Sequence, residues 1–102
     1  MARPRSELHD VLVGVLGSSN VYFQPPPKVK MVYPCIVYAR LFADTTFAGN
    51  MPYRYEKRYQ VTYIDRNPDS LVPDSIARLP MCVFNRHYAT DGLNHDVFNL
   101  YF

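Results

Sequence analysis

Cysteine, glycine and tryptophan are scarce in this chain, whose 102 residues include two cysteines, four glycines and no tryptophan. A secreted domain of this size usually carries more cysteines in a disulfide framework, so we expect Cys35 and Cys82 to be reduced and buried among apolar neighbours. None of the four glycines fits a phosphate-cradling loop. These shortages argue against a disulfide scaffold and against phosphate binding by a glycine-rich loop.

Long apolar runs are also missing. No stretch approaches the roughly 20 apolar residues needed to cross a bilayer, so we expect no membrane partner. The start, residues 1–7, lacks the apolar core and cleavage site of a signal peptide. The sequence therefore predicts a protein that is made and assembled in a cytoplasm.

The sequence also lacks long runs of residues with the same charge. The formal net charge is only +2, and the eleven basic residues are spread along the chain. The densest group runs from Arg54 to Arg58 and contains Glu56, which is typical of a solvated strand or loop. No run forms the basic stripe of a dedicated nucleic-acid-binding protein.

Apolar and aromatic residues are abundant. They make up 48% and 15% of the chain, which excludes intrinsic disorder, and the length indicates a single domain over residues 1–102. Nine of the fifteen aromatic residues are tyrosines. A tyrosine ring with its polar tip suits an interface between subunits, but it is equally ordinary in a β-sheet, and both interpretations remain open here.

The first half of the chain predicts one helix and two strands. Apolar residues recur at helical spacing over residues 5–16, and Gly17 follows as a helix terminator. Strands are predicted at 21–23 and 32–41, separated by a proline-rich connector at 24–27. Residues 43–52, with Gly49-Asn50 as a turn signal, are predicted to be a loop that faces a partner.

The second half predicts a long strand, a short helix and a hairpin. The strand covers 53–65, the helix 71–79, and the hairpin strands 81–88 and 95–102. The last strand ends in alternating apolar residues, which must be paired in a sheet or against another copy. The element order α-β-β-β-α-β-β indicates an α+β fold, with a mostly antiparallel sheet of four to five strands flanked by two helices.

Three groups of residues carry side chains that could perform chemistry. Cys82 with His87 would be a nucleophile and base, but Cys82 shares a predicted inward face with Phe84. A metal would need convergence of residues near one hairpin turn whose spacing matches no zinc pattern: His87, Asp91, His95 and Asp96. The acidic residues flanking the second helix are explained by turns and helix starts: Asp65, Asp69 and Asp74. We therefore predict no catalytic, cofactor-binding or metal-binding residues and no enzyme activity.

Several longer blocks of sequence carry a resemblance to a known family. They are residues 5–9 (RSELH), 20–26 (NVYFQPP), 31–38 (MVYPCIVY), 58–70 (RYQVTYIDRNPDS), 86–88 (RHY) and 91–96 (DGLNHD). In wording and order these blocks resemble the tail terminator, or tail completion, family found at the neck of tailed-bacteriophage virions. The resemblance covers nearly the whole chain and involves no catalytic motif.

The resemblance implies a homo-oligomeric ring, usually six-fold, in the virion neck. Such a ring would cap the tail tube protein, meet the head-side connector or head-closure protein, and let DNA pass through its lumen without specific binding. Residues expected at interfaces are Phe47, Tyr53, Tyr55, Tyr59, Tyr63, Tyr101 and Phe102. Basic residues expected to face the lumen are Arg54, Lys57 and Arg58.

Three alternatives remain at this point. The first is a head-closure, connector or tail-tube subunit of the same structural class. The second is a small nucleic-acid-binding module that stacks bases on strand tyrosines. The third, which the residues favour least, is a hydrolase built on Cys82 and His87.

Overall fold

The computed structural model describes residues 4–25, 30–48 and 51–102, and for residues 42–48 and 51–56 it describes the backbone alone. Two helices and five strands occur in the predicted α+β order. Their bounds are α1 (Arg5–Leu16), β1 (Val21–Phe23), β2 (Cys35–Ala48), β3 (Met51–Asp65), α2 (Val72–Ala77), β4 (Cys82–Thr90) and β5 (Leu93–Tyr101).

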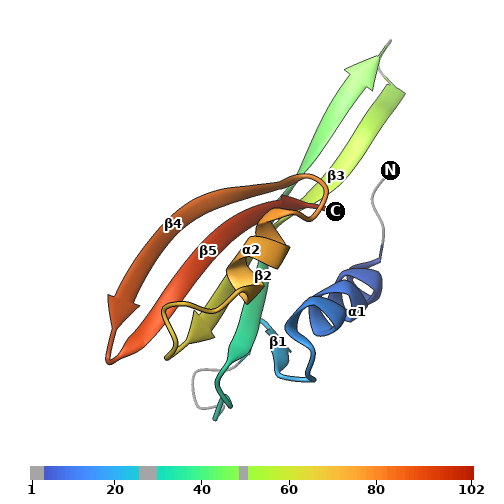
Figure 1. The fold of residues 1–102 in the computed structure, drawn as a ribbon. Coiled ribbons are helices and arrows are strands. Elements are labelled where there is room, and N and C mark those ends of the chain that lie inside the picture. The colour runs from blue at the N-terminus through green and yellow to red at the C-terminus, as the bar shows by residue number, and fades with distance from the viewer. Residues whose placement is uncertain (1–3, 26–29, 49–50) are drawn as a thin grey trace.

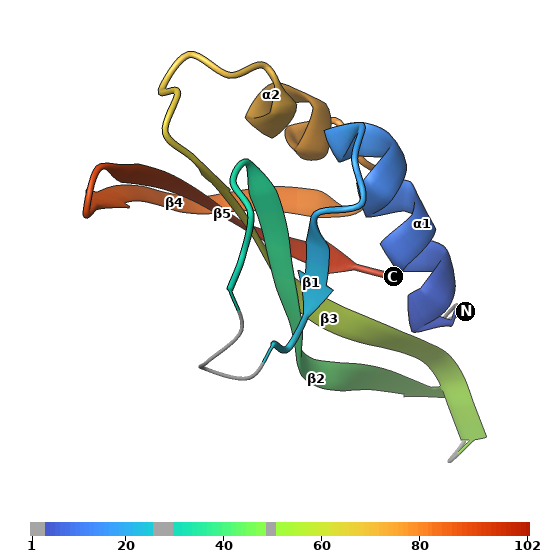
Figure 2. The same ribbon diagram turned by 90° about the horizontal axis from the view of Figure 1, so that it is seen from below.

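The strands form one mixed sheet in the order β1-β2-β3-β5-β4 (Figure 1). β1 runs parallel to β2, whereas the other three pairings are antiparallel. The apolar terminal strand β5 lies between β3 and β4, so both of its edges are paired, as its composition requires. Both helices cover the same face of the sheet (Figure 2).

The core fills the space between this face and the helices. α1 packs on β1, β2 and α2, and α2 packs on β4 and β5. Buried side chains from both layers form one cluster: Leu8, Leu12, Val21, Ile36, Tyr38, Tyr59, Val61, Tyr63, Ile76, Phe98 and Leu100. The apolar stripe predicted for α1 is narrower than its spacing indicates, because Val11 at its margin is 37% exposed.

Local interactions set the end of α1 and the start of α2. Gly17 adopts the left-handed conformation, with φ of 79°, and its N–H donates to the carbonyl of Val13 at 2.9 Å, which closes α1 as predicted. α2 is shorter than the predicted 71–79. Pro73 lies in its first turn, and the Ser70 hydroxyl accepts the Val72 N–H at 3.3 Å.

The prediction of a loop over residues 43–52 is wrong. These residues belong to β2 and β3, whose antiparallel pairing continues to Ala48 opposite Met51, while the predicted turn residues 49 and 50 lie outside the described part. Register irregularities between Arg40 and Phe42 and between Thr46 and Phe47 break the simple alternation, which explains why the sequence does not look like a strand.

We call residues 42–48 and 51–57 the arm. β5 pairs with β3 only as far as Arg58, and β1 pairs with β2 only as far as Tyr38, so the arm is a two-stranded ribbon that extends beyond the sheet (Figure 1). It makes the molecule elongated, with principal extents of 51 × 26 × 23 Å. β2 begins at Cys35 rather than at the predicted residue 32, because Pro34 has no N–H to offer a ladder.

The predicted C-terminal hairpin is confirmed. Thr90 pairs with Leu93, which leaves Asp91 and Gly92 as a two-residue loop. Their φ values of 54° and 74° are those of a type I′ turn, and the Asp-Gly pair is a preferred sequence for it.

Candidate assembly surface

The β3 tyrosines predicted at an interface lie in the core instead. Tyr59 and Tyr63 are 1% and 2% exposed, so the prediction that they face a partner is wrong. The Tyr63 hydroxyl donates to Asp65 Oδ2 at 2.6 Å and lies 2.9 Å from Ser70 Oγ. Because the polar tip finds partners inside the fold, the ring is buried without an orphaned hydroxyl. Burial and the Asp65 contact raise the pKa of Tyr63 to about 12.

The other predicted interface residues divide into two groups. Tyr101 and Phe102 are half-buried at the end of β5, where the Arg58 guanidinium lies 5.5 Å from the centre of the Tyr101 ring. Phe102 packs against the core cluster, and its N–H donates to the Lys57 carbonyl at 2.9 Å. The side chains of Phe47, Tyr53 and Tyr55 lie outside the described residues, although their backbone belongs to the arm.

The three basic residues predicted to line a lumen do not share one surface. Lys57 and Arg58 are consecutive in β3, so their side chains point to opposite faces of the sheet. Arg58 is on the face without helices, the face shared by its ladder partner Tyr101. The side chain of Arg54 is not among those described. The prediction that Lys57 and Arg58 line one surface together is therefore wrong.

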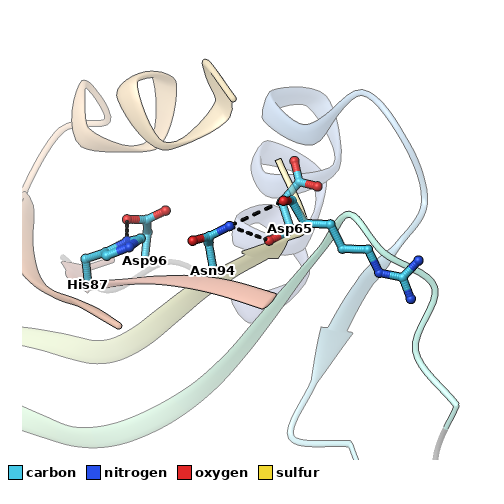
Figure 3. Close-up of polar contacts among 5 residues, drawn as sticks. Asp65, His87, Asn94 and Asp96 are labelled. Carbon is cyan, nitrogen blue, oxygen red and sulfur yellow. Dashed lines mark hydrogen bonds and ion pairs between the residues drawn. The ribbon is translucent and has the colours of Figure 1, made fainter. Parts of the chain in front are cut away.

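The histidines near the hairpin turn are separated by the sheet. His87 Nδ1 lies 2.7 Å from Asp96 Oδ1 (Figure 3), whereas His95 stacks on Tyr88 with ring centres 4.5 Å apart. His95 and Asp96 are adjacent in β5, so the two histidines occupy opposite faces and do not converge on one ion. Among residues 4–25, 30–48 and 51–102, no cluster of three potential metal-binding side chains occurs.

Next to the His87–Asp96 pair, a second polar contact joins the hairpin to β3. Asn94 Nδ2 lies 3.4 Å from the carbonyl oxygens of both Asp65 and Arg66 (Figure 3). The Asp65 carboxylate in turn accepts the Asn67 N–H at 3.1 Å. These contacts fix the turn after β3 against β5, so the acidic residue predicted to belong to turn chemistry does so.

The two thiols lack the features of a nucleophile. Burial, with a further contribution from the Asp65 charge, raises the pKa of Cys35 to about 11. Burial also raises the pKa of Cys82. A catalytic thiol needs a lowered pKa, because the thiolate is the reactive form. Cys82 packs against the core, and Phe84 shares its face of the sheet opposite Phe98, as predicted, although the Phe84 side chain remains 53% exposed.

Strand β4 is exposed along nearly its whole length, and the sequence did not single it out. It lies at the sheet edge, and every residue from Val83 to Thr90 is exposed. Four large apolar side chains in and beside it remain in contact with solvent: Met81 (51%), Val83 (60%), Phe84 (53%) and Tyr88 (41%). The adjacent apolar pair Val83-Phe84, which places one apolar residue on each face, is the signal that points to this surface.

No family model and no curated protein matches the chain. Neither helix in the described residues has the length and apolar character required to cross a bilayer.

Together, these placements make β4 and the arm candidate surfaces for contact with other proteins. β4 offers a strand edge flanked by apolar side chains on both faces. The arm offers backbone edges that no strand of the described residues pairs with. Such edges are templates for pairing with another chain.

Proposed function

We propose that this chain is a structural subunit of a tailed-bacteriophage neck. Copies of it form a closed ring that terminates the tail tube and joins it to the head-side connector, and the ring is assembled in the bacterial cytoplasm and retained in the virion. The proposal rests on the resemblance of six sequence blocks to tail terminator proteins.

One structural observation supports it. Among the described residues, β4 and the arm are both suited to strand pairing, and they are different from one another. Unlike surfaces on one chain favour heterologous, head-to-tail contact, which generates a ring when the rotation between copies closes. A two-fold dimer would instead require one surface that complements itself.

Electron microscopy of the purified protein, alone and mixed with preformed tail tubes, tests this function. The expected result is a ring of uniform diameter alone and the same ring at one end of each tube. Addition of the protein during tube polymerisation should also shorten the tubes. Long open tubes of this protein alone would identify it as a tail-tube subunit, and binding to connector rings but not to tubes would identify a head-closure protein.

A second function, binding of nucleic acid, is favoured by the face of the sheet without helices. There the Arg86 guanidinium lies 5.7 Å from the Tyr88 ring centre, and Tyr88 stacks on His95. Cationic and aromatic side chains in this arrangement are typical of sites that bind single strands. A gel shift in increasing salt tests it: tight binding that weakens steeply with salt and is lost in Arg86→Ala would favour this function over the neck ring.

A further inference from the structure

We propose that copies of this chain associate by strand pairing between the arm of one copy and the outer edge of β4 of the next. The contact deepens the proposed function by naming what would hold neighbouring subunits together. The strand pairing itself does not depend on the proposed function. Only the closure of the assembly into a ring rests on that function.

The β4 edge has the properties of a receptor for a strand. One side of β4 pairs with β5, and within the described residues its other side pairs with no strand. Val83 lies on the face without helices, and Phe84 lies on the helix-covered face opposite Phe98. An added strand would therefore gain backbone hydrogen bonds together with apolar contact on both sides of the sheet.

The arm has the properties of a donor. A two-stranded ribbon is at best marginally stable in water, and three or more strands are needed for independent stability. Beyond the Lys57 carbonyl, which accepts the Phe102 N–H, six residues of β3 (51–56) pair with no strand of the described residues on the side away from β2. At about 3.3 Å per residue these six residues span roughly 20 Å, which fits within the nine residues of β4.

The position of the two surfaces makes a second copy the partner. In both views the tip of the arm and the turn end of β4 lie at opposite ends of the molecule, so one copy cannot pair them with each other (Figures 1 and 2). Since both surfaces are on every copy, each copy pairs with one neighbour through its arm and with another through its β4. Arg86 is the only residue of β4 with a formal charge, apart from His87 beside Asp96, so little repulsion opposes the approach.

Two variants separate the donor from the receptor. In the armless variant, Asn-Gly replaces residues 44–56, so that Ala43 and Lys57, which already face each other in the ladder, close a two-residue turn. In the edge variant, Val83→Lys and Tyr88→Lys place charges along β4. A matched control carries Val32→Lys and Leu71→Lys, two substitutions away from β4 at apolar residues (60% and 77% exposed) that are at least as exposed as Val83 and Tyr88.

Sedimentation velocity measures the oligomeric state of each variant and of their mixture. The wild type and the control should form the same oligomer, and each variant alone should be a folded monomer by circular dichroism. Mixed in equal amounts, the two variants should form a heterodimer that does not grow, because it uses the one intact arm and the one intact edge. A monomeric wild type, assembly retained in either variant, or variants that fail to combine would each overturn the proposed contact.

Hydrogen exchange of the wild type gives an answer even if the armless variant does not fold. Amides of β4 and of the arm should gain protection as the concentration rises from monomer to oligomer, whereas amides of α1 should not change. Protection gained elsewhere, with none in β4 and the arm, would refute the contact. A confirmed contact in a protein that leaves tail tubes uncapped would refute the neck function alone.

Discussion

The side chain of Phe98 offers a sharp test of where the core lies. It is 1% exposed in β5, and its ring meets that of Phe84 on β4 edge to face, with centroids 5.5 Å apart. Phe84 is 53% exposed, although it occupies the paired position of the ladder. The two residues therefore share one ring contact and differ in burial, so Phe84→Ala is a matched control for Phe98→Ala.

The expected costs follow from this difference. Phe98→Ala should lower the free energy of unfolding by about 3–5 kcal/mol, because it removes a fully buried ring and leaves a cavity. Phe84→Ala should cost about 1–2.5 kcal/mol, from the ring contact of about 0.5–1.5 kcal/mol and partial loss of apolar burial. Against a total stability of roughly 5–15 kcal/mol, the first loss threatens folding and the second does not.

Urea unfolding followed by circular dichroism measures both costs, and the double variant gives the coupling between the rings. The measurements belong at several protein concentrations, because self-association adds to apparent stability and would add to the cost at Phe84. Equal costs in the monomer, or a loss below about 1 kcal/mol for Phe98→Ala, would refute the assignment of β5 to the centre of the core.

Three further predictions concern tyrosine, glycine and cysteine. The raised pKa of Tyr63 means that its contribution to stability is complete below about pH 10 and is lost as the pH rises toward about 12, so Tyr63→Phe should flatten that decline in urea melts, and an unchanged slope would contradict it. Gly92→Ala should lower stability by about 1–2 kcal/mol because φ is 74°, whereas Gly14→Ala within α1 should raise it by about 0.5–1 kcal/mol; thermal melts that place both changes in the same direction would show the turn conformation to be wrong. Alkylation of Cys35 and Cys82 near neutral pH should be slower in the folded protein than in urea, since the pKa of both thiols is raised; equal rates would mean that the thiols are not shielded.

Elements with strong local signals were predicted well. The helix ending at Gly17 and the hairpin turn at Asp91-Gly92 depend on residues close in sequence, and both appear where expected. The alternation of Phe98 and Leu100 required a paired strand, and β5 has a partner on each side. In these cases the local preference and the final fold agree, so the pattern was sufficient.

The position of a strand within the sheet could not be predicted in the same way. β4 and β5 both contain apolar residues, yet one is the sheet edge and the other lies inside it. That difference depends on pairing between β3 and β5, which are separated by α2 and β4 in the chain. The alternation of apolar and polar residues along a strand indicates which face is buried, but not which edge pairs with another strand.

Tyr59 and Tyr63 failed as interface signals for a related reason. Tyrosine composition is compatible with a core or an interface, and the choice depends on whether the hydroxyl finds a partner inside the fold. Tyr38 shows this for the core: its hydroxyl accepts from the Arg5 guanidinium at 2.9 Å and lies 2.8 Å from His9 Nδ1. Arg5 and His9 come from α1, about 30 residues away in sequence, and only the folded chain brings them to β2.

The burial of these tyrosines restricts how the proposed assembly can form. If Tyr59 and Tyr63 stabilise the protomer's own core, the helix-covered face is already in use, and association depends on strand edges. Pairing at a strand edge is sensitive to register, because a shift of one residue moves every side chain of the added strand to the opposite face. The irregularity between Phe84 and Arg86 in β4 interrupts that periodicity, so it restricts the registers an incoming strand can adopt. If only one register is permitted, every subunit of the proposed ring has the same rotation relative to its neighbour, which is the condition for a ring of fixed size.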